Sequence, residues 1–137
     1  NIAGVKEASG NLEQIMTIIK DKPEGFLVIS GDDLITLPLL AAGADGVISV
    51  VANGFPREFS EMVRLCMKEN FEKARELHYL LSDITPMLFA EGSPPGIKAV
   101  LSMMGVCDDF LRLPLVNISK ALQNKISAEV EKIHEMV

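Results

Sequence analysis

One lysine near the start of the chain occupies a position where covalent chemistry can occur. Lys6 directly follows a short apolar segment, residues 2–5, whose pattern predicts a buried strand. A lysine amine forms a Schiff base with a ketone only in its neutral form, and apolar burial favours that form. A lysine after a strand can also lie with its stem along apolar surface and its charge in water. Lys6 is therefore a candidate nucleophile whose role depends on its surroundings.

Two later segments carry residues that can join Lys6. Gly31, Asp32 and Asp33 follow a second apolar run, and Ile48 lies in a third. Gly31 either lets the backbone approach a ligand closely or simply makes a turn. The two aspartates can cap the next helix or bind a metal, but no His or Cys joins them at ligand spacing, so we expect no metal site. Ile48 can offer its carbonyl or side chain to a small ligand, or belong to the core.

Three strand–helix units are predicted to position these residues. The strands are short, continuous apolar runs, as in a sheet with both faces covered, at residues 2–5, 26–29 and 46–50. Apolar residues at helical spacing follow each strand, predicting helices over residues 12–19 and 34–42 and a third starting at Pro56 or Arg57. Ser9 or Asn11 is expected to cap the first of these helices.

The rest of the chain is predicted to be helical. Amphipathic patterns cover residues 71–81 and 84–89, and a further helix runs from Pro95 to Met104. The last helix is capped by Asn117 or Ser119, and its apolar positions are Leu122, Ile126, Val130 and Ile133.

Alternating strands and helices predict an α/β fold with parallel strands, either flavodoxin-like or part of a (β/α)₈ TIM barrel. The helical stretch that follows favours the last three βα units of a barrel, residues 1–68, with a C-terminal helical appendix, residues 69–137. A barrel has eight strands, so we expect roughly the second half of one, opening like the middle of a protein. Its open sheet edges are expected to drive self-association or pairing with another chain.

Composition restricts the function classes. The 137 residues carry a net charge of −6 and no basic stripe, which argues against nucleic-acid or anionic-membrane binding. No apolar run is long enough for a membrane span and no signal peptide is recognisable, so a cytoplasmic location is expected. Cys66 and Cys107 are read as two buried, reduced thiols, and His78 and His134 as surface residues.

Three segments, in order, resemble those of dihydrodipicolinate synthases: residues 4–11 (GVKEASGN), 30–33 (SGDD) and 46–53 (GVISVVAN). Residues 95–98 (PGIK) and 111–115 (LRLPL) resemble the family's C-terminal helical segment, so the likeness covers essentially the whole chain. N-acetylneuraminate lyases share the Schiff-base lysine but tend to differ at the second and third segments.

This resemblance implies a specific reaction. Lys6 would condense with pyruvate to an imine, whose enamine attacks aspartate semialdehyde in lysine and diaminopimelate biosynthesis. Ile48 would contact bound pyruvate, while Gly31 and Asp32 would line the pocket. The resemblance implies no cofactor and no metal, and it makes a homo-oligomer, or pairing with the remaining half of the barrel, the expected assembly.

The resemblance also identifies missing groups. The family's paired threonines, its catalytic tyrosine and its substrate-binding arginine belong to the first half of the barrel. Tyr79 is the only tyrosine here and falls in a predicted helix, so the role does not transfer to it. We expect the isolated chain to be weakly active or inactive. The alternatives are a non-catalytic half-barrel and another pyruvate-dependent aldolase such as N-acetylneuraminate lyase.

Overall fold

The computed structural model describes residues 1–136, which contain a parallel three-stranded sheet followed by a helical region. The strands are β1 (Gly4–Glu7), β2 (Leu27–Ser30) and β3 (Gly46–Val47), in the order β1-β2-β3. Lys6 pairs with Ile29 and Ile29 pairs with Gly46, so these three residues form one row across the sheet. The predicted parallel strands are thus confirmed.

The strands differ from the prediction at both ends of the sheet. Lys6 lies inside β1 instead of just beyond it, because backbone pairing continues to Glu7. Conversely, β3 has only two residues instead of five. The chain turns into a 3₁₀ helix, η1 (Val51–Asn53), which removes the last predicted strand residues from the sheet. A continuous apolar run does not reveal where such a turn begins.

Seven α-helices lie within the described residues: α1 (Leu12–Asp21), α2 (Thr36–Ala41), α3 (Pro56–Met67), α4 (Phe71–Ser82), α5 (Ile84–Met87), α6 (Pro95–Met103) and α7 (Lys120–Met136). The structure decides both capping alternatives. Asn11 Oδ1 accepts a hydrogen bond of 3.1 Å from the Gln14 amide at the start of α1. Ser119 Oγ accepts one of 3.2 Å from the Leu122 amide at the start of α7.

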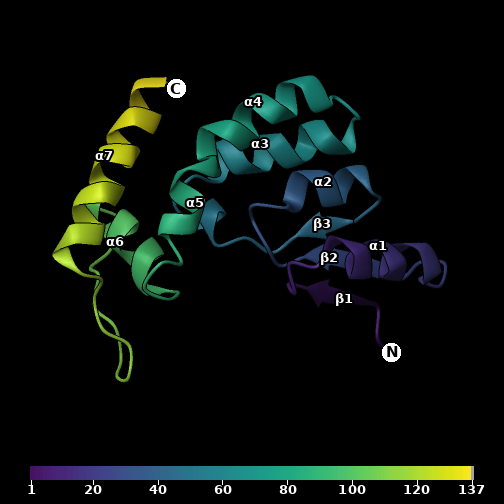
Figure 1. Ribbon diagram of the computed structural model, residues 1–137, viewed down its shortest axis with the longest axis horizontal. Helices are drawn as coiled ribbons and strands as arrows, with labels where there is room; N and C mark the ends of the chain where they lie inside the picture. Colours follow the sequence, from purple (N-terminus) through teal and green to yellow (C-terminus); the bar gives the residue numbers. More distant parts are fainter. Residues whose placement is uncertain (137) are drawn as a thin grey trace.

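Helices α1 and α2 alternate with the strands, whereas α3 to α7 follow the sheet in sequence and extend away from it (Figure 1). The strands, α1 and α2 lie together, α3 and α4 pack along each other beside α2, and α6 and α7 pack together at the other end of the molecule. One hydrophobic core joins α1 and β2 to α7, because Ile15, Val28 and Ile126 belong to the same buried cluster. A domain boundary between residues 68 and 69 stays a prediction.

The two faces of the sheet have different environments. Successive residues of a strand point to opposite faces, so the strand register assigns each side chain to one face. On the face we call the covered face, Val28 and Ser30 are fully buried. On the face we call the open face, Leu27 is 44% exposed. Ile29 lies two residues after Leu27 and so points to the same face. Lys6 pairs with Ile29 and therefore also belongs to the open face.

Two expectations about polar and thiol groups are corrected. Cys66 is buried, but Cys107 is exposed because it follows α6 in the segment that connects α6 to α7. His134 is exposed as expected, whereas His78 is partly buried where α4 packs on the body of the molecule. Desolvation there lowers the pKa of His78. Among residues 1–136, no helix combines the length and the apolar character needed to span a bilayer.

Candidate active site

Lys6 and Gly31 meet on the open face. The Gly31 amide donates a 2.7 Å hydrogen bond to the Glu7 carbonyl, which extends the β1–β2 pairing one residue past the end of β2. A Cβ atom built on Gly31 would lie 2.8 Å from Lys6 Cε and 2.7 Å from Ala8 Cβ, closer than real Cβ contacts. The Lys6 side chain therefore crosses the space that the missing Gly31 side chain leaves free. The structure thus brings Lys6 and Gly31 together.

Ile48 reaches the same face from the third strand. Its amide donates a 2.9 Å hydrogen bond to the Ser30 carbonyl, so pairing with β2 continues for one residue after β3 ends. Strand alternation places Ile48 on the side of Gly46, in the row of Gly31. Ile48 is 58% exposed, so its interpretation as a core residue is wrong in this chain. Lys6 and Ile48 thus stand on one apolar surface.

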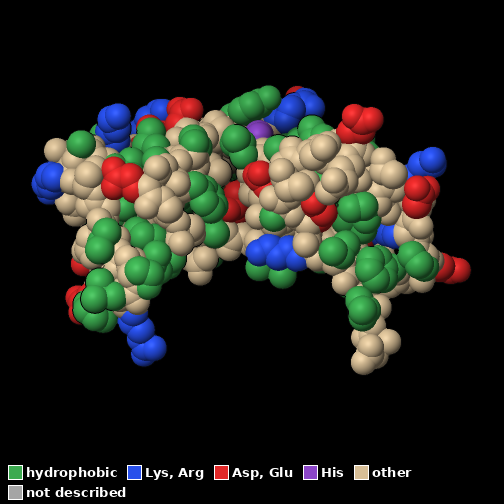
Figure 2. Space-filling view, turned by 60° about the horizontal axis from the view of Figure 1, so that its bottom comes forward, with side chains coloured by type: hydrophobic (Ala, Val, Ile, Leu, Met, Phe, Trp, Pro, Cys, Tyr) green, Lys and Arg blue, Asp and Glu red, His purple; other side chains and the backbone are tan. Residues whose placement is uncertain are grey.

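The environment of Lys6 differs from the expected buried strand end. Lys6 is exposed, because no described element lies over the open face. Figure 2 shows this side of the molecule, with apolar side chains on both flanks of a hollow between two projecting ends. The Lys6 amine is therefore not enclosed by apolar side chains of the described residues. The structure therefore supplies the position of the lysine without the surroundings the sequence predicted.

The two aspartates after β2 have different tasks. Asp32 Oδ1 accepts a 3.0 Å hydrogen bond from the Leu34 amide and closes the turn that leads into α2. Asp33 is only 4% exposed, and its Oδ2 accepts a 3.0 Å bond from the amide of Val50. Neither carboxylate caps α2 itself, because the N-cap residue Ile35 has no side-chain hydrogen bond. The capping expectation is therefore wrong for both aspartates, because Asp32 closes the preceding turn and Asp33 bonds to the segment after β3.

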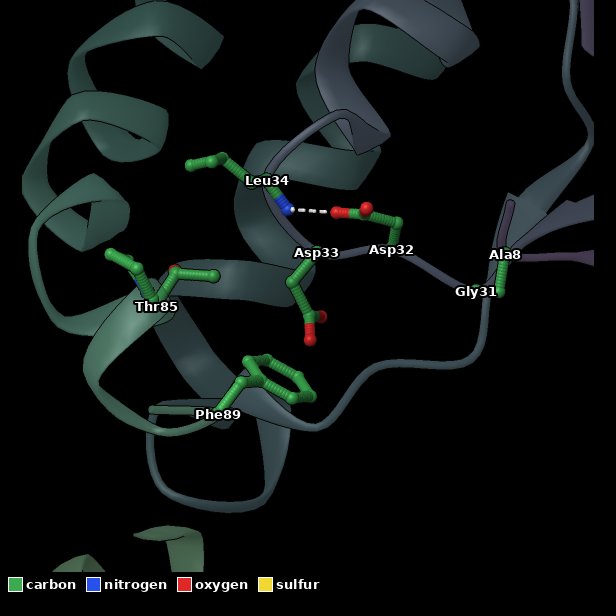
Figure 3. Close-up of a pocket in the computed structure, with 8 residues that line it drawn as sticks. Ala8, Gly31, Asp32, Asp33, Leu34, Thr85 and Phe89 are labelled. Carbon is green, nitrogen blue, oxygen red and sulfur yellow. Dashed lines mark hydrogen bonds between the residues drawn. The ribbon is translucent and has the colours of Figure 1, made fainter. Parts of the chain in front are cut away.

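A cavity of about 390 Å³ lies between this turn and α5. In Figure 3 the carboxylates of Asp32 and Asp33 point in opposite directions, and that of Asp33 is directed toward the ring of Phe89. The cavity is lined by Ala8, Gly31, Asp32, Asp33, Leu34, Thr85, Pro86 and Phe89.

Sequence reasoning missed the contribution of α5 to this cavity. Thr85 is buried and donates a 2.6 Å hydrogen bond to the Leu81 carbonyl, so it forms part of the wall without a free hydroxyl proton. Phe89 follows α5 and is partly exposed. The amphipathic pattern of residues 84–89 predicts only a helix, and nothing in its spacing indicates a cavity wall.

Comparison with known proteins identifies the family. The sequence matches the model of the Dihydrodipicolinate synthetase family over residues 1–133. The chain belongs to this family. It is 46% identical over 126 residues to the 4-hydroxy-tetrahydrodipicolinate synthase of Flavobacterium psychrophilum, a match that covers 92% of this chain and 43% of the relative. The chain thus spans about half the length of the curated relatives it matches.

Solved structures of the dihydrodipicolinate synthetase family agree with the fold. The Aquifex aeolicus dihydrodipicolinate synthase superposes with a TM-score of 0.94 at 42% identity, covering 98% of this chain and 46% of that one. The chloride-inhibited enzyme of Acinetobacter baumannii, solved in complex with pyruvate, gives a TM-score of 0.94 at 30% identity, with coverage of 98% and 46%. The predicted fold class is confirmed: three parallel βα units of a TIM barrel are followed by a C-terminal helical region.

Proposed function

We propose that this chain supplies the Schiff-base lysine, Lys6, of a 4-hydroxy-tetrahydrodipicolinate synthase in cytoplasmic lysine and diaminopimelate biosynthesis. The observation that carries the proposal is the position of Lys6 across Gly31 on the open face, in a chain whose family relatives bear that enzyme's name. The substrates are pyruvate and aspartate semialdehyde. Ile48, Gly31 and Asp32 surround the bound pyruvate.

The chemistry needs only the lysine to form the covalent intermediate. Lys6 Nζ attacks the ketone carbon of pyruvate, the carbonyl oxygen leaves as water, and an imine remains. Loss of a proton from the pyruvyl methyl group gives an enamine, whose carbon attacks the aldehyde carbon of aspartate semialdehyde. The imine acts as an electron sink and divides a difficult carbon–carbon bond formation into easier steps. Cyclisation and release then free the Lys6 amine.

The test is reductive trapping of the imine. The protein is incubated with pyruvate and borohydride, its intact mass is measured and the adduct is mapped to a peptide. A reduced pyruvyl group confined to the peptide containing Lys6 is the expected result. The same measurement is repeated on residues 1–137 joined to the part of the Aquifex aeolicus synthase that the chain does not cover. In this joined protein the added part is expected to cover the open face.

Two substitutions at Lys6 serve as controls. Lys6→Ala should remove the adduct while the circular dichroism spectrum stays unchanged, because Lys6 is exposed and holds no core contact. Lys6→Arg should be equally unreactive, since a guanidinium stays charged and is not a nucleophile. Pyruvate-dependent labelling that survives Lys6→Arg would refute the covalent role. Turnover of N-acetylneuraminate in place of aspartate semialdehyde would favour the alternative function, an N-acetylneuraminate lyase.

A second candidate is a half-barrel that has no activity by itself. It is favoured by the exposure of Lys6 and Ile48, which leaves the site without a cover. On this reading the chain pairs through its strand edges with another copy or with a chain that supplies the remaining strands. Light scattering and apolar-dye binding test it: a monomer without dye binding contradicts pairing. An adduct that appears only in the joined protein favours this candidate over the first.

A further inference from the structure

The carboxylate of Asp33 connects two segments that are distant in sequence. Its Oδ2 accepts hydrogen bonds of 3.0 Å and 3.4 Å from the amides of Val50 and Val51. Asp33 belongs to the turn after β2, whereas these amides lie where the chain leaves β3 and enters η1. A buried carboxylate oxygen that accepts hydrogen bonds from two amides makes a directional connection. Asp33 therefore ties the segment after β3 to the turn that contains Gly31.

Local interactions alone do not fix this segment against the sheet. Ser49 Oγ accepts a 2.8 Å bond from the Ala52 amide, and Asn53 Nδ2 donates to the carbonyls of Ser49 and Val50 at 3.3 Å and 3.0 Å. These bonds shape the turn internally. Pairing with β2 ends at the Ile48 amide, so the residues that follow depend on Asp33 and on the burial of Val51 for their position.

The carboxylate of Asp33 is buried, so its hydrogen bonds to the protein, and not contact with solvent, explain its position. Asp33 Oδ1 is buried and has no hydrogen-bond partner, although Oδ2 has two. A buried polar atom without a hydrogen-bond partner is unfavourable, and an apolar residue at this position would avoid that cost. Figure 3 shows the carboxylate extending from the turn toward the cavity. Only a side chain with an acceptor at this reach serves both amides.

We propose that Asp33 is a positioning residue that sets the location of Ile48 relative to Lys6. This inference rests on the proposed function, in which Ile48 contacts the pyruvate bound to Lys6. Asp33 holds the amides two and three residues after Ile48, and Gly31 next to the Lys6 side chain lies two residues before Asp33. Together with the hydrogen bond from the Ile48 amide to the Ser30 carbonyl, this carboxylate thus sets the spacing between the amine and the residue that contacts its substrate.

The first test compares pyruvate binding in Asp33→Ala and Asp33→Asn by borohydride trapping, in the joined protein described above. In Asp33→Ala the pyruvate concentration for half-maximal labelling should rise about tenfold, a shift equivalent to ~1.4 kcal/mol, while labelling at saturation is unchanged because Lys6 is untouched. Asp33→Asn keeps an acceptor oxygen for the Val50 amide and should remain within about twofold of the unmodified protein. A merely structural role would reduce the labelled fraction without this shift.

The second test does not depend on activity. Hydrogen exchange of the peptide spanning residues 48–53 should accelerate in Asp33→Ala, whereas the peptide spanning α1 keeps its protection. Asp32→Ala is the matched control, because Asp32 accepts from Leu34 and not from this segment, so exchange of residues 48–53 should not change.

The outcomes separate this inference from the proposed function. Absence of any adduct in the unmodified joined protein overturns the proposed function and the catalytic part of this inference together. Labelling with the same half-saturation in Asp33→Ala, or unchanged exchange of residues 48–53, overturns the positioning role alone. If Asp33→Ala does not fold, Asp33→Ser takes its place, and loss of the fold in both variants would make Asp33 a general stability residue and refute the positioning role.

Discussion

The covered and open faces of the same sheet differ in what this chain supplies for them. Val28 on the covered face is inaccessible to solvent, whereas Leu27 beside it is 44% exposed. The covered face is packed by helices that follow each strand in sequence. The open face has apolar side chains of similar type but no described element above it. The difference shows that local βα packing completes one side of a sheet without completing the other.

The candidate site belongs to the incomplete side. This side carries Lys6, Gly31 and Ile48, which lie on the open face at or near the C-terminal ends of the strands. A sheet of three strands can therefore align these groups, while the enclosure that a buried amine requires must come from additional structure. Alignment and enclosure are therefore separable properties, and substitutions on the two faces or at the two ends of the sheet should affect them differently.

The largest effect is expected from a matched pair of isoleucine truncations. Ile15→Ala removes a fully buried side chain from the core under the covered face and should lower the free energy of unfolding by about 2–5 kcal/mol. Ile48→Ala, on the open face, should change it by less than about 0.5 kcal/mol. Urea denaturation of both variants measures the difference. Equal costs would mean that the open face is covered in solution, for example by a second copy.

Two glycines provide a sharper test of the open face. Gly31→Ala places a methyl group against Ala8 and Lys6 and should cost about 1–3 kcal/mol of stability while strongly slowing pyruvate labelling. Gly46→Ala is the control, because its new methyl group would meet only Ile29 Cδ1 at an ordinary 3.6 Å. Stability and trapping are measured together. Normal labelling in Gly31→Ala would show that the Lys6 side chain does not need this space.

The smallest effect concerns the opposite end of the strands. Asp45 Oδ2 accepts hydrogen bonds from Lys22 Nζ at 2.5 Å and from the Val28 amide at 2.8 Å. The Lys22 bond first, and the Val28 bond second, lower the pKa of Asp45. Its stabilising contribution is therefore complete above the ordinary carboxyl value of 3.8 and is lost as the pH falls below it, through the lowered pKa of the folded state.

Asp45→Asn should accordingly cost about 1 kcal/mol at neutral pH, since the pair is partly exposed, and should flatten the acid limb of the stability curve. Asp21→Asn is the control, because Asp21 is well exposed and its carboxylate forms a longer ion pair, at 3.8 Å, with Lys20. Thermal unfolding from pH 7 to pH 3 checks both variants. Pyruvate labelling at pH 7 should be unaffected by either change, and a loss in Asp45→Asn would argue against the independence of the two strand ends.

The element order was predictable from sequence because it depends on short-range patterns. Apolar spacing gave α1, α3, α4 and α7 within a few residues, and Asn11 was among the expected caps. The end of β3 was not predictable, because the apolar run continues through Val50 and Val51 while their amides turn to Asp33. A strand limit set by a side chain 17 residues earlier leaves no local trace in sequence.

The candidate site was predictable in position but not in environment. Parallel strands bring their C-terminal ends to one edge, so the convergence of Lys6, Gly31 and Ile48 followed from topology. The exposure of Lys6 and the contribution of Thr85 and Phe89 depend on long-range packing, which single-residue reasoning does not contain. A carboxylate near a helix start usually caps the helix, so the sequence does not reveal that Asp33 bonds to the amides of Val50 and Val51 instead.

The alternation of β1 has a consequence for the adjacent residues Lys6 and Glu7. Glu7 is almost fully buried and accepts hydrogen bonds from the Ser9 amide and Gln14 Nε2. An acid and an amine that are neighbours in sequence are therefore kept on opposite sides of the sheet and do not neutralise each other. A slip of β1 by one residue would exchange them, placing the acid on the open face. Strand register in β1 thus selects which of these two side chains stands on the open face.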